Sequence, residues 1–115
     1  MSVARLTINR SSFLDYADVL RNLTPFRTGG SLRGMVGAPW ATAFGWGQLD
    51  IREGFGKLFR DKWEADKVTY TVLSYATPIA FRDDEGKWHI NTEKYSVTTS
   101  KSQTKIFAAV AMVSD

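Results

Sequence analysis

Apolar positions at the start of the chain first alternate and then recur with a helical period. Residues 3–8 alternate weakly, which predicts a short edge strand. A helix is expected next, capped by Ser11 or Ser12 and ending near Asn22. Its apolar face is formed by residues at helical spacing, namely Phe13, Tyr16, Ala17 and Leu20.

A β pattern dominates the second half of the chain. Residues 68–75 alternate β-branched and aromatic side chains, which is typical of a strand. Residues 79–82 and 87–90 flank a four-residue turn and predict a hairpin, while Pro78 indicates an edge position, a bulge or a kink. Residues 95–99 predict one more strand. These segments together predict an antiparallel meander of about four strands.

The middle of the chain is rich in glycine and is expected to be irregular. Glycine recurs through residues 26–47, which favours turns and loops. Three aromatic residues are interleaved with this stretch: Trp40, Phe44 and Trp46. Beyond it, Gly54 and Gly56 are expected to break a helical pattern, because glycine is unfavourable in a helix interior. The helix that remains is predicted from about Leu58 to Glu64.

A final helix is predicted over residues 102–113, with Thr99 or Ser100 as its cap. The sequence as a whole predicts one α+β domain over residues 1–115. The expected architecture is the antiparallel meander of about four strands with two or three helices, including the C-terminal helix.

Composition excludes several classes of protein. The 115 residues contain no cysteine, which excludes a disulfide scaffold, a thiol nucleophile and a cysteine-bound zinc. We expect a cytoplasmic protein without a membrane segment, since the N-terminus lacks the apolar core of a signal peptide and no apolar run could span a bilayer. The net charge is +3, and residues 1–60 alone carry +4. This asymmetry permits an anionic partner.

Signatures of an enzyme, a metal site or a cofactor site are weak. His89 is the one histidine, without a nucleophile pattern, so it is interpreted as an exposed or hydrogen-bonded strand residue. The acidic run 83–85 lacks calcium-loop spacing and is expected to be a solvated hairpin tip. The glycine-rich segment 29–34 lacks the Gly-Lys-Ser/Thr ending of a phosphate loop. We therefore expect no enzyme, no cofactor and no metal.

Hydroxyl and cationic side chains at the start of the last helix form a candidate anion site. Helix N-termini attract anions through their unpaired N–H groups. The predicted nucleic-acid-binding set combines this helix start with two arginines: Arg27, Arg33, Thr98, Thr99, Ser100, Lys101 and Lys105. An alternative is that the hydroxyls are only ordinary strand and cap residues.

Two segments carry a resemblance to a known family. Residues 74–81 read Ser-Tyr-Ala-Thr-Pro-Ile-Ala-Phe and residues 95–100 read Tyr-Ser-Val-Thr-Thr-Ser. They resemble the paired motifs of small uncharacterised proteins of actinobacteriophages, mycobacteriophages especially, with similarity over about residues 26–107. This chain has Phe81 where that family has Trp, and Ser102 where it has His. The resemblance implies a phage or mobile-element setting and no mechanism.

Two binding functions and one enzymatic function remain as hypotheses. The leading hypothesis is a non-enzymatic phage accessory protein that binds a macromolecule, with DNA or RNA as the expected partner. The alternative is a host-protein-binding or inhibitory protein that docks through Trp40, Phe44 and Trp46 as aromatic anchors. Acid–base catalysis is the third hypothesis, without support from residue spacing.

Overall fold

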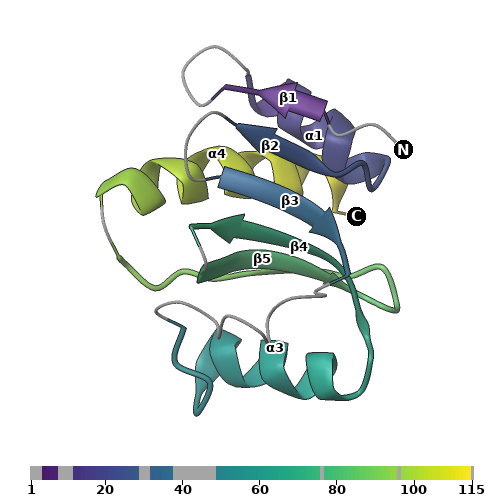
Figure 1. The fold of residues 1–115 in the computed structure, drawn as a ribbon, viewed down its shortest axis with the longest axis vertical. Helices are drawn as coiled ribbons and strands as arrows, with labels where there is room; N and C mark the ends of the chain where they lie inside the picture. The colour runs from purple at the N-terminus through teal and green to yellow at the C-terminus, as the bar shows by residue number, and fades with distance from the viewer. Residues whose placement is uncertain are drawn as a thin grey trace.

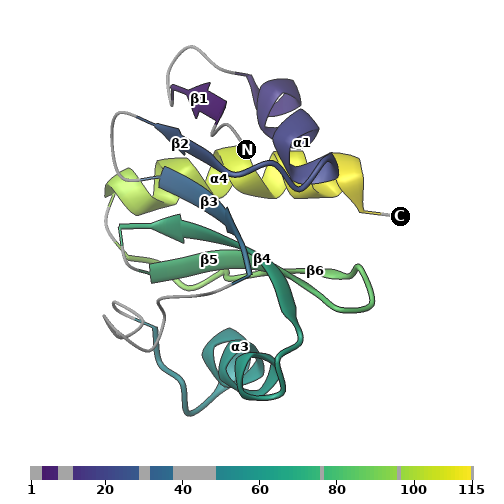
Figure 2. The same ribbon diagram turned by 45° about the vertical axis from the view of Figure 1, so that its right-hand side comes forward.

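A six-stranded mixed sheet carries three helices among the described residues (Figures 1 and 2). The computed structural model describes residues 4–7, 12–28, 32–37, 49–75, 77–95 and 97–114. The strands are β1 (Ala4–Leu6), β2 (Phe26–Thr28), β3 (Leu32–Val36), β4 (Val68–Ser74), β5 (Thr77–Asp83) and β6 (Trp88–Ile90). The helices are α1 (Phe13–Arg21), α3 (Gly54–Glu64) and α4 (Val97–Val113). The predicted α+β class and C-terminal helix are confirmed, whereas the predicted four-stranded antiparallel meander is wrong.

The sheet is mixed because one pair of strands, β1 and β2, is parallel. Helix α1 connects the end of β1 to the start of β2, so both strands run in the same direction. Strand β1 pairs in parallel with β2, and the remaining strands pair antiparallel in sequence order. Ser12 caps α1 with a capping box, in which Asp15 Oδ2 accepts a 2.8 Å hydrogen bond from the Ser12 backbone N–H. The predicted first helix and edge strand are therefore confirmed. Their parallel connection could not be seen in the local pattern.

Two strands lie where the glycine-rich stretch predicted irregular structure. Strands β2 and β3 form an antiparallel pair within residues 26–36. Gly34 sits in β3 because a Cβ atom there would overlap the Phe26 ring and the Tyr70 hydroxyl. The many glycines in this part of the sequence suggested a loop. At Gly34, however, glycine is needed because the strand packs closely against the core.

The β4–β5–β6 hairpins follow the predicted pattern closely. The turn after Asp83 is closed by hydrogen bonds from the Asp83 N–H to the Lys87 carbonyl and from the Gly86 N–H to the Asp83 carbonyl. Pro78 pairs with Leu73 beside a shift in register. The irregularity that proline predicted is thus present, inside the sheet.

Both later helices begin earlier than predicted. Helix α3 begins at Gly54, so Gly54 and Gly56 belong to its first turn and do not break it. Glycine is required at position 56, since a Cβ there would overlap the Asp50 backbone. Helix α4 begins at Val97, so the strand predicted over residues 95–99 is wrong. Thr98, Thr99 and Ser100 lie in its first turn, since tertiary packing outweighs the strand preference of threonine.

Helices cover the two faces of the sheet unequally. The main core joins α1 and α4 to one face through residues such as Tyr16, Phe26, Val72 and Ile106. A smaller aromatic core joins α3 to the other face through Phe59 and Phe81. In Figure 1, α4 runs behind the strands and α3 lies at the end of the molecule away from β1. Over the described residues, no helix has the length and apolarity needed to cross a bilayer.

Candidate functional site

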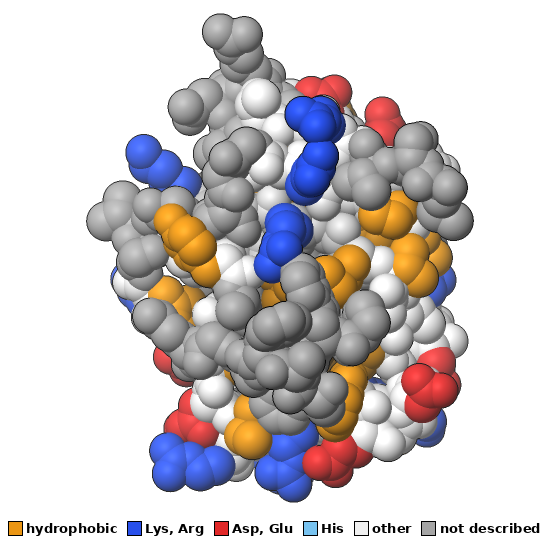
Figure 3. All heavy atoms as spheres, in the orientation of Figure 1, with side chains coloured by type: hydrophobic (Ala, Val, Ile, Leu, Met, Phe, Trp, Pro, Cys, Tyr) orange, Lys and Arg blue, Asp and Glu red, His pale blue; other side chains and the backbone are white. Residues whose placement is uncertain are grey.

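Three arginines form a row across the first three strands. Arg5 is the register partner of Arg27 in the β1–β2 pair, and Arg27 is the register partner of Arg33 in the β2–β3 pair. Register partners project from the same face, so the three side chains follow one another at the strand spacing, about 4.8 Å, over roughly 10 Å. Figure 3 shows blue side chains in a line over these strands. We call Arg5, Arg27 and Arg33 the arginine row.

The arginine row lies on the sheet face opposite α1 and α4. Phe26 and Leu32, which precede Arg27 and Arg33 in their strands, are buried in the main core. The Phe26 ring packs edge-on against Tyr16 of α1, with 5.5 Å between ring centroids. Alternation along a strand then directs the arginines to the other face. Arg5 and Arg27 are exposed, and Arg33 is half-buried.

Arg5 and Arg27 form no ion pair with any described residue. Ion pairs among the described residues include Arg21–Asp18, Arg52–Asp50, Lys57–Asp61, Arg60–Glu64 and His89–Asp83, and neither Arg5 nor Arg27 takes part in them. Like charges directly opposite each other destabilise neighbouring strands. Arg5 and Arg27 therefore repel each other in the unbound protein, and a bound polyanion would relieve that repulsion, whereas Arg33 has an interaction partner of its own.

A cavity of about 400 Å³ opens beside the row, at the carboxyl ends of the parallel strands β1 and β2. Its described lining consists of Arg5, Leu6, Thr7, Arg27 and Thr28. The Thr28 hydroxyl donates a 3.1 Å hydrogen bond to the Leu32 carbonyl, which fixes its position. Guanidinium and hydroxyl groups are the usual partners of phosphate oxygens, and Leu6 adds apolar surface.

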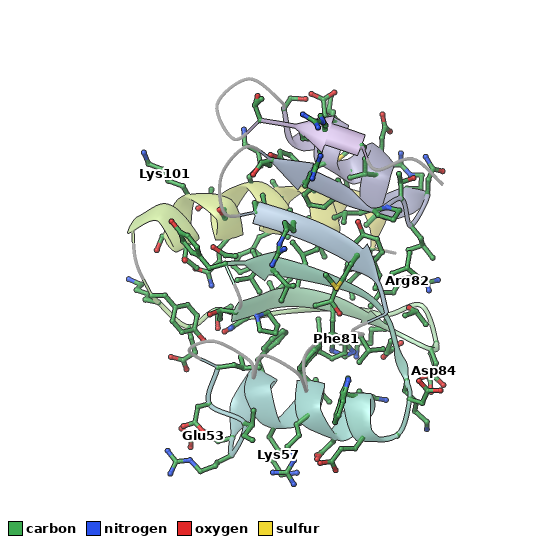
Figure 4. All side chains as sticks on the ribbon, in the orientation of Figure 1. Glu53, Lys57, Phe81, Arg82, Asp84 and Lys101 are labelled. Carbon is green, nitrogen blue, oxygen red and sulfur yellow. The ribbon has the colours of Figure 1, made fainter. Side chains whose placement is uncertain are left out.

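The hydroxyl-rich start of α4 lies apart from the arginine row. Helix α4 covers the face of the sheet away from Arg27 and Arg33. Lys101 is exposed and points outward from α4 (Figure 4). The structure thus does not bring the predicted lysines together with the predicted arginines.

The other predicted residues of this helix start are less accessible than Lys101 wherever their side chains are described. Thr99 is buried, and its hydroxyl lies 3.1 Å from the Ser74 hydroxyl. Ser100 and Lys105 are half-buried, and Lys105 has an interaction partner. The Thr98 side chain lies outside the described part of the structure.

The two segments that carry the family resemblance meet in space. Besides the Ser74–Thr99 contact, the Asn91 side-chain amide donates to the Pro78 carbonyl at 3.1 Å and to the Tyr95 hydroxyl at 3.0 Å. Asn91 itself is fully buried. These bonds connect the end of β4, the start of β5 and the loop before α4.

Gln103 extends this network from the next turn of α4. Its side-chain amide donates to the backbone carbonyls of Asn91 at 2.6 Å and Glu93 at 2.9 Å. We call the set Ser74, Pro78, Asn91, Tyr95, Thr99 and Gln103 the polar joint. Buried polar groups need such partners, so the polar joint gives these motif residues a structural role.

An acidic cleft adjoins the loop before α4. Its volume is about 380 Å³, and its described lining includes the carboxylates of Asp50, Glu53 and Glu93 beside Asn91 and Tyr95. Glu53 lies at the start of α3 (Figure 4). Negative charge at this position disfavours a polyanion near the α4 start.

The acidic hairpin is anchored by a buried carboxylate. Asp83 is 4 % exposed and its Oδ1 accepts 2.9 Å hydrogen bonds from the Glu85 and Lys87 backbone N–H groups, while Oδ2 lies 2.9 Å from His89 Nε2. The solvated tip predicted over residues 83–85 is therefore wrong for Asp83 and holds for exposed Asp84 and Glu85. His89 also stacks on Phe81, with 4.7 Å between ring centroids. These contacts give His89 a role in the hairpin.

Acid should destabilise the protein partly through Asp83. Burial opposes ionisation, but hydrogen bonds from His89, Lys87 and Glu85 outweigh it and lower the pKa of Asp83. A lowered pKa stabilises the fold above the pKa of the unfolded carboxyl, about 3.9, and this contribution is lost as the pH falls through the folded value. We expect Asp83→Asn to lower the unfolding free energy at pH 7 by about 2 kcal/mol. Urea unfolding at pH 7 and pH 3 should show a smaller acid-induced loss in Asp83→Asn, and an equal loss would contradict this assignment.

Sequence reasoning missed Arg5. It lies in the predicted edge strand, but its place in the row depends on the parallel pairing of residues 4–6 with residues 26–28. Alternation in residues 3–8 indicated a strand and gave no partner. The predicted protein-binding residues Trp40, Phe44 and Trp46 lie outside the described residues.

Comparison with known proteins identifies the family. The model of a family of unknown function, DUF8033, matches residues 1–112. No curated protein and no solved structure matches the sequence. With nearly the whole chain covered by this match, the protein belongs to the DUF8033 family.

Proposed function

We propose that this protein is a non-enzymatic module that binds nucleic acid through the arginine row. The observation that carries the proposal is the register Arg5–Arg27–Arg33 across β1, β2 and β3. Guanidinium groups match the geometry of phosphate oxygens and remain charged at all physiological pH values. Because exposed Arg5 and Arg27 lie in one line with half-buried Arg33, the row suits a chain of phosphates.

The distribution of charge supports a long anion. Residues 1–60 carry a net charge of +4, and Arg5 and Arg27 take no part in the ion pairs formed by Arg21, Arg52, Lys57 and Arg60. Such a field attracts polyanions at low salt. The setting we propose, from the resemblance in the two motif segments, is that of a phage accessory protein.

Replacing the central arginine should weaken binding without weakening the fold. We expect Arg27→Gln to reduce affinity for a fluorescein-labelled 20-nucleotide oligonucleotide about tenfold at 50 mM salt, since a charge-assisted contact is lost. The melting temperature should stay equal or rise, because the like-charge pair with Arg5 is relieved. Fluorescence anisotropy and circular dichroism measure the two quantities.

Lys101→Gln is the matched control for this variant. It removes the same charge from an exposed position on α4, away from the row. We expect less than a twofold change in affinity. Equal losses in the two variants would show that overall charge, and no particular row, determines binding, and an absence of binding at low salt would refute the proposed function.

A further inference from the structure

The arrangement of the arginine row restricts the form of nucleic acid that fits it. The three side chains make a single line of roughly 10 Å, set by the strand spacing. In a duplex, the phosphates that face a protein border a groove on two sides, about 6 Å or 12 Å apart. A single line of cations can follow the phosphates of only one nucleic-acid backbone. The row therefore fits a single-stranded nucleic acid better than a duplex.

None of the described helices is placed beside the row so that it could enter a groove of a duplex. Helices α1 and α4 pack against the opposite face of the sheet. Helix α3 is on the same face as the row, but Phe59 and Phe81 hold it over β5. A duplex would thus meet a line of strand side chains, whereas helices are the common means of entering the major groove.

The cavity beside the row can hold an unpaired base, which a single strand has and a duplex lacks. It measures about 400 Å³, within the range of small-ligand pockets, and Arg5 and Arg27 belong both to its lining and to the row. The flat guanidinium groups of Arg5 and Arg27, and the part of Leu6 that is not packed against the main core, offer surfaces on which an unpaired base can stack. Bases of a duplex are already stacked and paired.

We propose that the ligand is a single-stranded nucleic acid whose backbone follows the arginine row and one of whose bases enters the cavity at the ends of β1 and β2. This inference rests on the proposed function and specifies its substrate. The phosphates contact Arg5, Arg27 and Arg33 in turn. The base lies against Leu6 and Thr7, where the two parallel strands end.

Three labelled probes of equal length test the proposal by anisotropy. They are a 15-nucleotide thymidine strand, the same strand paired with its adenine complement, and an abasic 15-mer with the same phosphates. We expect the single strand to bind about tenfold more tightly than the duplex and the abasic strand, because the duplex has no unpaired base to place in the cavity and the abasic strand has no base at all. Its affinity should fall with salt with a slope near −2, about −0.7 for each of three phosphates.

Arg5→Gln tests the cavity and the row together, with Lys101→Gln as its control. We expect Arg5→Gln to weaken single-strand binding about tenfold and to reduce the salt slope by about 0.7, with duplex binding less affected. Equal or tighter binding of the duplex would overturn the single-strand inference and leave the proposed function intact. Equal binding of the abasic strand would overturn the role of the cavity. Binding of none of the probes, or equal binding of polyglutamate, would overturn both proposals.

Discussion

Phe59→Ala should release α3 from the sheet. Phe59 is fully buried, and its ring centroid lies 5.3 Å from that of Phe81 and 6.4 Å from that of Phe55. Removing a buried phenyl ring costs about 3–5 kcal/mol. Among the described residues, Phe59 and Phe81 are the two fully buried members of this cluster. The substitution therefore removes half of the small buried core that holds α3 on the sheet. We expect urea unfolding to show a decrease of that size.

The loss of stability in Phe59→Ala should be confined to α3. Amide hydrogen exchange in α3 should accelerate strongly, whereas α1 and α4, which belong to the main core, keep their protection. Leu14→Ala is the control, because Leu14 is 52 % exposed on α1 and its truncation should change stability by less than about 0.5 kcal/mol. A decrease below about 1 kcal/mol for Phe59→Ala, or uniform acceleration across all helices, would contradict the two-core description.

Local patterns in the sequence were sufficient for elements that local physics controls. The capped first helix, the strand from Val68 and the turn after Asp83 all depend on periodicity, capping or turn chemistry within a few residues. Gly34 and Gly56 misled for a common reason. Each is required by the close approach of another group, the Phe26 ring and the Tyr70 hydroxyl at Gly34 and the Asp50 backbone at Gly56, and hydrophobic periodicity does not reveal such an approach.

The candidate site shows the same division. Arg27 and Arg33 were chosen from the sequence for their charge, and their register pairing could not be known in advance. Arg5 and the cavity depend on a parallel pairing between strands about twenty residues apart. The residues 98–105 were expected to form one accessible pocket, but the structure buries Thr99 against Ser74 and leaves Lys101 exposed. Helix capping chemistry is visible in a sequence, whereas which side of a helix faces the core at its first turn is a tertiary property.

Asn91→Ala should produce the second large loss of stability, through the polar joint. The side-chain amide donates to the Pro78 carbonyl and the Tyr95 hydroxyl, and its oxygen accepts a 3.0 Å bond from the Glu93 backbone N–H. Alanine removes all three bonds and leaves the buried Pro78 carbonyl without this partner. Each net bond contributes about 1 kcal/mol and an unpaired buried group costs about 1–3 kcal/mol more. We therefore expect a decrease of about 4 kcal/mol in urea unfolding.

Tyr95→Phe separates the amide network from the general packing of the loop. It removes one hydroxyl acceptor and keeps the ring, so the expected loss is about 1 kcal/mol. Because Asn91 directly follows β6, three strands away from β3 in the sheet, Asn91→Ala should bind oligonucleotides as the parent does at a temperature where both are folded. If affinity fell together with stability, or if Asn91→Ala and Tyr95→Phe lost equal stability, the motif residues would need a role beyond holding β4, β5 and α4 together.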